Sequence, residues 1–370
     1  MTMDKVIFNE ISLANGKRLG HARLNKPQAL NALDLDMIQL LMPQLTTWQA
    51  DGDVVAVVLD GEGDKAFCAG GDVVDMYHAM VASPDSTPAK VEQFFTEEYQ
   101  LDYLIHTFGK PFVVVGNGIV MGGGLGLFAG ASHRIVTPTS RIAMPEITIG
   151  LYPDVGGSYF LNQMPTGVGL FLGLTGASIN ARDALDINLA DAAMNDVTHL
   201  IDALRCLDWQ GESAADNTMI GTWLAQQTEQ ATLPAGQVRE VMQECVSFAA
   251  MRTSEQIVAA ILGMDNTGNE WLQRAQKTLQ QGCPLTMAIV PEQLSRAQDM
   301  SLADVFRMEL TLSCRCAQMG EFQEGVRALL IDKDRSPKWR YQNAAEITPQ
   351  VVAHMFTPLW QGAAHPLARL

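Results

Sequence analysis

The sequence from Gly116 to Gly157 reads GNGIVMGGGLGLFAGASHRIVTPTSRIAMPEITIGLYPDVGG, and it contains three consecutive glycines, Gly122 to Gly124. Glycine has no Cβ, so its amide can approach a ligand closely. If a helix starts at the triplet, the amides of its first turn lack acceptors within the helix. Such N–H groups stabilise a carbonyl oxygen that gains negative charge. The stretch therefore predicts a turn that can hold a developing oxyanion.

Two carboxylates lie downstream of the triplet in apolar surroundings. Glu146 follows Pro145, and Asp154 follows Pro153. Carboxylates in such positions serve as general acids, general bases or nucleophiles. An isolated acid is more often a solvated surface residue, and glycine clusters also mark tight turns. A second glycine site upstream, at residues 69–72 (Ala-Gly-Gly-Asp), favours the interpretation of these features as an active site.

Composition limits the class of protein and its partners. The chain has 370 residues, 47% of them hydrophobic, which is enough for a large core and two structural parts. A net charge of −16 disfavours a nucleic-acid partner but leaves small anionic molecules open. The six cysteines have no metal-ligand spacing and do not indicate a disulfide framework. The N-terminus lacks a signal-type apolar core, and the longest uncharged apolar run is too short to cross a membrane. We therefore expect a soluble cytoplasmic protein with no metal site and no membrane partner.

Short strands and helices alternate through the first half of the chain. Asn15-Gly16 predicts a hairpin between the first two strands, and Asp34 is a suitable N-cap for a helix. We expect strands at residues 6–13, 18–24, 54–60, 66–68, 112–115, 134–137 and 142–144, with helices at 35–50, 91–108 and from the glycine triplet to 131. This alternation predicts an α/β layered or spiral core. Strand signals fade from about residue 200, so we expect an α/β core over residues 1–204 and a helical region over 205–370.

Several common catalytic motifs are missing from the sequence. It contains no G-x-S-x-G elbow, no phosphate-binding G-x-x-x-x-G-K-[ST], no H-E-x-x-H and no dinucleotide-binding G-x-G-x-x-G after a strand. Cys68 lies near a glycine site, but nothing basic flanks it to stabilise a thiolate. We therefore interpret Cys68 as a packed residue.

The motifs at Ala66–Asp72, Gly116–Gly124, Ala143–Glu146 and Gly150–Gly157, in this order, resemble the crotonase (enoyl-CoA hydratase/isomerase) superfamily. Within it, the M-P-E and P-D-V-G-G pairing and the block at Glu324–Trp339 resemble the 3-hydroxyisobutyryl-CoA hydrolases, a thioesterase family. The resemblance implies a spiral of ββα units with a helical C-terminal region. It also implies an acyl-CoA substrate and no separate cofactor, because CoA is part of the substrate.

The resemblance also implies roles for individual residues. The amides of Gly71 and Gly123 would form the oxyanion hole for the thioester carbonyl. The CoA moiety would lie along Lys26, Ala29, Ala69, Gly70 and Asp72, where Lys26 suits the phosphates.

Departures from the hydratase pattern favour one reaction over another. Typical hydratases carry two glutamates, and this chain has Gly126 at the first position and Glu146 at the second. Asp154 stands where hydratases have glycine. These changes favour thioester hydrolysis, with Glu146 as nucleophile or base and Asp154 orienting water or the 3-hydroxyl of the substrate. The alternatives are an enoyl-CoA hydratase/isomerase and a catalytically silent acyl-CoA-binding subunit. The sequence leaves the oligomeric state open and allows a homo-oligomer.

Overall fold

The computed structural model describes residues 4–84 and 86–370 and divides the chain into two compact units. The first unit comprises Met1–Gly71, Leu101–Ile142 and Ile179–Gly236, and the second comprises Asp72–Gln100, Ala143–Ser178 and Gln237–Leu370. The sequence analysis placed a boundary between residues 204 and 205 because the local composition changes near there. The compact units have different bounds because distant segments of the chain pack together in each.

The larger sheet of the first unit has six strands in the order β1-β2-β3-β5-β7-β10. Its strands are β1 (Val6–Ser12), β2 (Arg18–Leu24), β3 (Val54–Gly61), β5 (Phe112–Gly116), β7 (His133–Val136) and β10 (Ala192–Ala193). β1 and β2 form the expected antiparallel hairpin, and the remaining pairs are parallel. β5 is buried along its whole length, as is typical of a parallel strand covered on both faces.

The smaller sheet of the first unit positions the glycine segments. Its order is β4-β6-β8-β9, with β4 (Ala66–Cys68), β6 (Ile119–Met121), β8 (Arg141–Ala143) and β9 (Ile179–Asn180). β4 and β6 are parallel neighbours. Because the carboxyl ends of parallel neighbours meet at one edge of a sheet, the loops that follow these two strands start side by side.

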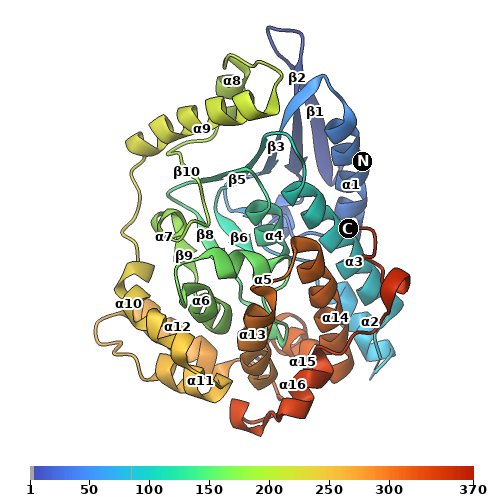
Figure 1. Cartoon of the computed structure of the whole chain (residues 1–370), viewed down its shortest axis with the longest axis vertical. Helices are drawn as coiled ribbons and strands as arrows, with labels where there is room; N and C mark the ends of the chain where they lie inside the picture. The colour runs from blue at the N-terminus through green and yellow to red at the C-terminus, as the bar shows by residue number, and fades with distance from the viewer. Residues whose placement is uncertain (1–3, 85) are drawn as a thin grey trace. The chain divides into compact units, whose positions relative to one another are not determined.

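Helices cover the sheets of the first unit: α1 (Leu35–Ala50), the end of α3 (Ala89–His106), α4 (Gly123–Ala129), α7 (Ala181–Asp186), α8 (Leu200–Arg205) and α9 (Ser213–Gln230). The Asp34 side chain accepts from the Met37 amide at 3.0 Å, which confirms the expected N-cap of α1. Leu204 and Ile220 belong to the same buried apolar cluster as Val58 and Val113 of the sheet. Helices α8 and α9 therefore pack with the sheet (Figure 1).

The second unit is mainly helical. It contains α2 (Val74–Ala82), the start of α3, α5 (Gly157–Phe160), α6 (Val168–Thr175), α10 (Met242–Cys245), α11 (Ser254–Leu262), α12 (Glu270–Gln281), α13 (Pro284–Ala297), α14 (Leu302–Met319), α15 (Glu321–Val326) and α16 (Pro349–Met355). Its core includes tilted aromatic pairs of Tyr99 with Phe95 and with Phe306. Tyr99 therefore places a hydroxyl group inside an otherwise apolar core, where a buried tyrosine normally forms a hydrogen bond.

The expected α/β class with a helical C-terminal region is confirmed. The expected strands and the helix at residues 35–50 agree with the structure to within one or two residues, which is the usual uncertainty of an element's end. Among the residues that the structure describes, no helix is long and apolar enough to cross a membrane.

Candidate active site

The two glycine segments are neighbours in the first unit. The pairing of β4 with β6 brings Cys68 opposite Val120. A Cβ on Gly124 would lie 2.4 Å from the carbonyl oxygen of Cys68, and one on Gly70 would lie 3.4 Å from that of Met121. The structure therefore places the segment at 69–71 against the start of α4, as two neighbouring turns at one sheet edge.

Backbone geometry explains why glycine is needed at this edge. Gly122 has φ 49° and ψ −127°, and Gly70 has φ 108°, conformations that side chains with a Cβ rarely adopt. Gly123 is the first residue of α4, so its amide belongs to the turn that has no acceptor within the helix. The structure thus supplies the local geometry that the sequence indicated. The direct contact of the Gly71 and Gly123 amides with a substrate oxygen stays a prediction.

The segment expected beside the CoA moiety lies against the first glycine site. The Ala69 amide donates to the Leu30 carbonyl at 3.1 Å, and the Leu33 amide donates to the Gly70 carbonyl at 2.8 Å. Leu30 adopts φ 53°, directly after the short 3₁₀ helix η1 (Pro27–Ala29). Residues 29–33 and 69–71 therefore form one continuous strip of the first unit.

Lys26 takes part in an ion-pair network. Its Nζ lies 3.0 Å from Asp34 Oδ2, and Lys5 Nζ lies 2.9 Å from the same oxygen and 2.6 Å from Asp36. A CoA phosphate would have to compete with Asp34 for Lys26. Asp72, the remaining residue expected near CoA, is half-buried and begins the second unit.

Glu146 opens the short 3₁₀ helix η2 (Glu146–Ile149) of the second unit and is only 4% exposed. Its Oε2 has no hydrogen-bond partner among residues 4–84 and 86–370. Burial raises the pKa of Glu146 well above its usual range, and the nearby Asp154 raises it further. A buried acceptor without a partner is costly, and at a functional site it indicates a group that awaits a ligand or water.

Asp154 sits at a strained turn that another helix holds in place. The next residue, Val155, has φ 53°, which is unfavourable for a β-branched side chain, and Gly156 has φ 84°. Glu309 of α14 accepts from the Gly156 amide at 2.8 Å and from the Ser158 amide at 2.9 Å. These two hydrogen bonds hold the turn and therefore fix the position of Asp154.

Three buried acids of the second unit lie within electrostatic reach of one another. Burial raises the pKa of Asp154 to about 7, against the opposing effect of Tyr99, whose hydroxyl lies 2.7 Å from Asp154 Oδ2. Burial also raises the pKa of Glu98 on α3 well above its usual range, and the charges of Asp154 and Glu146 add to this. Because three such groups cannot all ionise in a buried site, protons must be shared among them.

Glu98, Tyr99 and Glu309 were missed by the sequence analysis, although a signal exists for two of them. Glu98 lies four residues after Phe94 and three before Leu101, on the buried stripe of α3. Glu309 has the same relation to Val305 and Leu312 on α14. An acid on the apolar stripe of a helix is unusual, because buried charges need partners, and the helical spacing alone could have found both residues.

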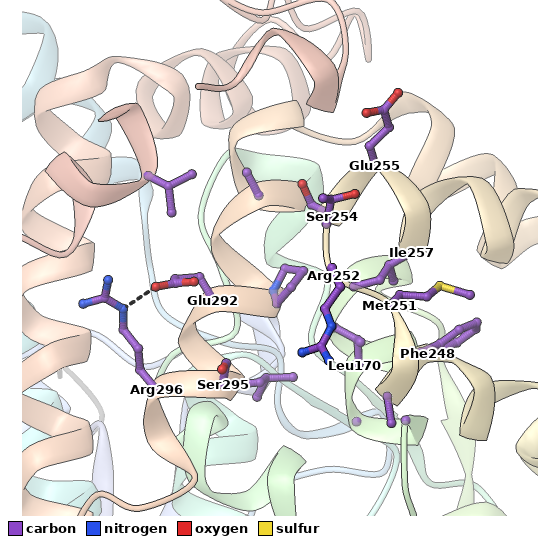
Figure 2. A pocket seen from close by; sticks show the side chains of 18 of the residues that line it. Leu170, Phe248, Met251, Arg252, Ser254, Glu255, Ile257, Glu292, Ser295 and Arg296 are labelled. Carbon is purple, nitrogen blue, oxygen red and sulfur yellow. Dashed lines mark hydrogen bonds and ion pairs between the residues drawn. The ribbon is translucent and has the colours of Figure 1, made fainter. Parts of the chain in front are cut away.

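A separate groove of about 1040 Å³ lies within the second unit, and its walls come from α6, α11, α13 and α16 (Figure 2). Arg252 and Glu255 are among its lining residues, and Arg296 pairs with Glu292 at 2.7 Å. None of the described residues that line it belongs to the acid group of Glu98, Glu146 and Asp154.

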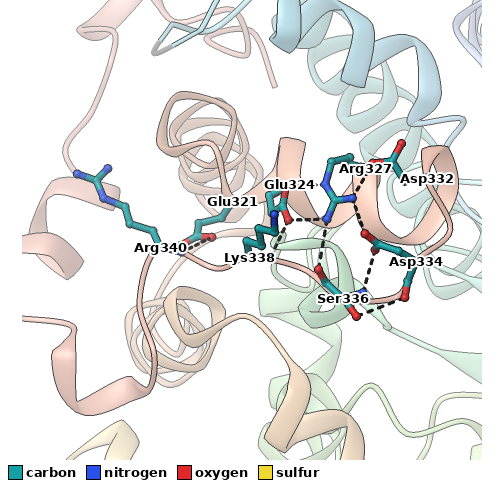
Figure 3. A network of polar contacts seen from close by, with 8 residues as sticks. All are labelled: Glu321, Glu324, Arg327, Asp332, Asp334, Ser336, Lys338 and Arg340. Atoms are coloured by element: carbon teal, nitrogen blue, oxygen red, sulfur yellow. Dashed lines mark hydrogen bonds and ion pairs between the residues drawn. The ribbon is translucent and has the colours of Figure 1, made fainter.

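The block at Glu324–Trp339 contains a network of ion pairs centred on Arg327. Arg327 pairs with Glu324 at 2.8 Å, with Asp332 at 2.7 Å and with Asp334 at 2.8 Å (Figure 3). Glu324 also accepts from the Lys338 amide at 2.6 Å. These contacts hold the segment that follows α15 against that helix. The block at Glu324–Trp339 therefore stabilises the local fold of the C-terminal region.

The glycine turns and the buried acids define a candidate active site, and comparison with known proteins identifies the family of the chain. The chain matches the enoyl-CoA hydratase/isomerase family model over residues 19–356 and belongs to that family. The resemblance to the crotonase superfamily is thereby confirmed. Among curated proteins, the chain is similar to the mitochondrial 3-hydroxyisobutyryl-CoA hydrolase of Danio rerio, with 34% identity covering 96% of this chain and 90% of the relative. It is 33% identical to the mitochondrial 3-hydroxyisobutyryl-CoA hydrolase of Homo sapiens, covering 95% of this chain and 89% of the relative.

Two crystal structures show the same fold over nearly the whole chain. One is an enoyl-CoA hydratase from Rhodobacter sphaeroides, with TM-score 0.83, 34% identity and coverage of 96% of this chain and 98% of the other. The second is a carnitinyl-CoA dehydratase from Mycobacterium thermoresistibile, with TM-score 0.82, 32% identity and coverage of 96% and 97%. The expected crotonase-like fold is therefore confirmed.

Proposed function

We propose that this protein is a thioesterase that hydrolyses 3-hydroxyisobutyryl-CoA, or a close short 3-hydroxyacyl-CoA, to the free acid and CoA. The observation that carries this proposal is the buried Glu146, whose Oε2 has no partner among the described residues, within electrostatic reach of Asp154. The Danio rerio and Homo sapiens relatives are named as 3-hydroxyisobutyryl-CoA hydrolases, which supports the choice of substrate.

The proposed roles follow from the chemistry of each group. The amides of Gly71 and Gly123 donate to the thioester oxygen as it gains negative charge. Ionised Glu146 either attacks the thioester carbon or removes a proton from the water that attacks it. In the first route a mixed anhydride forms, the CoA thiolate leaves with the electron pair of the C–S bond, and water then hydrolyses the anhydride. Both routes require Glu146 without its proton.

Hydration is the competing reaction, and the two similar solved structures are named as a hydratase and a dehydratase. The position of the first hydratase glutamate is Gly126, a buried residue of α4. A glycine supplies no proton donor or acceptor from a side chain. Hydrolysis therefore fits the residues of this chain better than water addition to a double bond.

One paired assay tests the proposal. Release of CoA from 3-hydroxyisobutyryl-CoA is followed with a thiol reagent, and hydration of crotonyl-CoA is followed by the loss of enoyl absorbance. We expect kcat/KM for hydrolysis to exceed that for hydration by far, and a panel of acyl-CoAs then identifies the preferred acyl group. A preference for hydration would overturn the hydrolase proposal. Binding of acyl-CoA without either reaction would favour the silent binding subunit.

The proposal extends to the setting in which the protein acts. We place the substrate in valine breakdown and the protein in the cytoplasm, although the two relatives are mitochondrial proteins. Detection of the protein in a mitochondrial fraction would contradict this location. We also propose a homo-oligomer, which light scattering coupled to size-exclusion chromatography would contradict by giving a monomer mass.

A further inference from the structure

A continuous chain of hydroxyl groups runs from Asp154 into α14 within the second unit. Asp154 Oδ2 lies 2.7 Å from Tyr99 Oη, which lies 2.7 Å from Ser313 Oγ. Ser313 Oγ lies 2.8 Å from Tyr152 Oη, and Tyr152 Oη donates to the main-chain carbonyl of Glu309 at 2.5 Å. All four contacts have hydrogen-bond length and join fully buried groups.

The hydroxyl groups of this chain supply fewer hydrogens than its contacts need. The three hydroxyls supply three hydrogens, one each. The chain has four contacts, and each contact needs one hydrogen between its two oxygens. The Glu309 carbonyl at the far end can only accept. The fourth hydrogen can therefore come only from Asp154, as the proton of its neutral carboxyl group.

The direction of each bond follows from the fixed end. Because Tyr152 donates to the carbonyl of Glu309, Ser313 donates to Tyr152, and Tyr99 donates to Ser313. Protonated Asp154 then donates to Tyr99, and every contact is satisfied. When Asp154 ionises, Tyr99 turns to donate to it and one contact further along loses its hydrogen. Two buried oxygens with facing lone pairs at this distance are unfavourable.

We propose that Ser313 and Tyr152 keep Asp154 neutral in the resting protein, because they engage the hydrogen that Tyr99 would otherwise donate to the ionised carboxylate. Tyr99, Ser313 and Tyr152 are therefore positioning residues that set the protonation of Asp154. A neutral Asp154 places no negative charge beside Glu146, so it lowers the cost of ionising Glu146 as nucleophile or base. The catalytic consequence rests on the proposed hydrolysis, whereas the hydrogen count does not.

The electrostatic surroundings also favour the neutral form of Asp154. The pKa of Asp154 is raised to about 7 by its burial. The named groups around Asp154 are acids, hydroxyls or thiols, so none of them offers a positive charge to its carboxylate. They come from every packed element: Glu98 and Tyr99 of α3, Glu146 of η2, Tyr152, and Glu309, Ser313 and Cys316 of α14.

Substitutions at different links of the chain should move the pKa of Asp154 in opposite directions. Tyr99→Phe removes the donor that stabilises ionised Asp154, so the pKa should rise. Ser313→Ala removes the hydroxyl that accepts the Tyr99 hydrogen. Tyr99 can then donate to ionised Asp154 without breaking another hydrogen bond, so the pKa of Asp154 should fall. Tyr152→Phe removes the fixed end and should also lower it. If these hydroxyls only made the site more polar, all three losses would raise the pKa.

The experiment is a pH titration of the full-length protein labelled with ¹³C at the aspartate carboxyl carbon. NMR follows the Asp154 resonance, which is assigned by its loss in Asp154→Asn. We expect a midpoint near neutral pH in the parent, moved by about one pH unit upward in Tyr99→Phe and downward in Ser313→Ala and Tyr152→Phe. Thr311→Val is the matched control, because its buried hydroxyl lies on the same helix but bonds the Arg307 carbonyl.

The outcomes separate this proposal from the proposed function. A parent midpoint at the ordinary pKa of aspartate, or shifts of one sign in all three variants, would overturn the hydroxyl-chain proposal, and circular dichroism identifies any variant that fails to fold. The titration needs no turnover, so the predicted shifts in a protein that hydrolyses no acyl-CoA would refute the hydrolase alone. In an active enzyme the pH midpoint of kcat/KM should move in the same direction as the NMR midpoint.

Discussion

The glycine edge of the first unit and the acid group of the second unit prepare chemistry in different ways. The glycine edge consists of backbone amides at Gly70–Gly71 and Gly122–Gly124, and it can form only because glycine has no side chain. The acid group consists of buried side chains, Glu98, Glu146 and Asp154, whose charges are unfavourable where they lie. The first carries no buried charge, whereas the second is held against the electrostatic cost of its buried acids.

The comparison shows where each region is vulnerable. An added Cβ at the glycine edge meets backbone atoms that cannot move away, as at Gly124 against Cys68. A neutralised acid in the second unit fits without clash and removes a charge that burial disfavours. We therefore expect glycine substitutions to damage both fold and activity, and acid substitutions to damage activity while leaving the fold intact or more stable.

The largest effect is expected at Glu146. Glu146→Gln keeps the shape of the side chain but removes both nucleophile and base, so turnover should fall by about 10⁴-fold or more. CoA binding, measured by titration calorimetry, should be retained. Asp154→Asn should impair turnover less, mainly for substrates with a 3-hydroxyl. A Glu146→Gln protein that hydrolyses at nearly the parent rate would refute the proposed role of Glu146.

The next effect is expected at the glycine edge. Gly123→Val places a branched side chain at the first turn of α4, where the amide should meet the thioester oxygen. We expect turnover to fall by about 100-fold. A thermal melt checks that the variant is folded, and Gly221→Val on the open face of α9 is the matched control. Full activity in folded Gly123→Val would remove this residue from the oxyanion hole.

The pH dependence of stability tests the cost of the buried acids. Asp154 has a pKa of about 7 in the folded protein against 3.8 ordinarily, so the folded state binds more protons between these values. The free energy of unfolding should therefore fall as pH rises from about 4 to about 7. Asp154→Asn removes this dependence and should be more stable than the parent at neutral pH, by on the order of a few kcal/mol.

Urea unfolding at several pH values measures this difference. The exposed Asp299 provides a control, because Asp299→Asn changes the same group outside the buried acid group. If the free energy of unfolding of the parent rose with pH relative to that of Asp154→Asn, this result would contradict the raised pKa of Asp154.

The smallest effects separate glycines by their surroundings. A Cβ on Gly124 would lie 2.4 Å from a carbonyl oxygen, whereas one on Gly221 of α9 would meet nothing within 4 Å. Gly124→Ala should destabilise the protein by about 1–3 kcal/mol, as overpacking does. Gly221→Ala should stabilise it by up to about 1 kcal/mol, because alanine favours a helix. Equal effects on the melting temperature would show that the contact at Gly124 relaxes freely.

The sequence by itself determined the features that depend on neighbouring residues. The hairpin at Asn15-Gly16, the N-cap at Asp34 and the glycine turns could be predicted because local backbone conformation decides them. Glu146 and Asp154 were selected as candidate catalytic residues for a similar reason, since each stands beside a proline in an apolar segment. The membership of the family followed from motifs in the right order, and it too needed no knowledge of packing.

Only the tertiary structure decided which distant groups meet. Tyr99 reaches Asp154 across 55 positions and Ser313 across 214, and no local pattern records such a distance. Packing also assigned α9 to the sheet unit, although the sequence analysis placed its residues in the helical region. Burial and long-range hydrogen bonds set the protonation of an acid, and both arise only when segments far apart in the chain exclude water together.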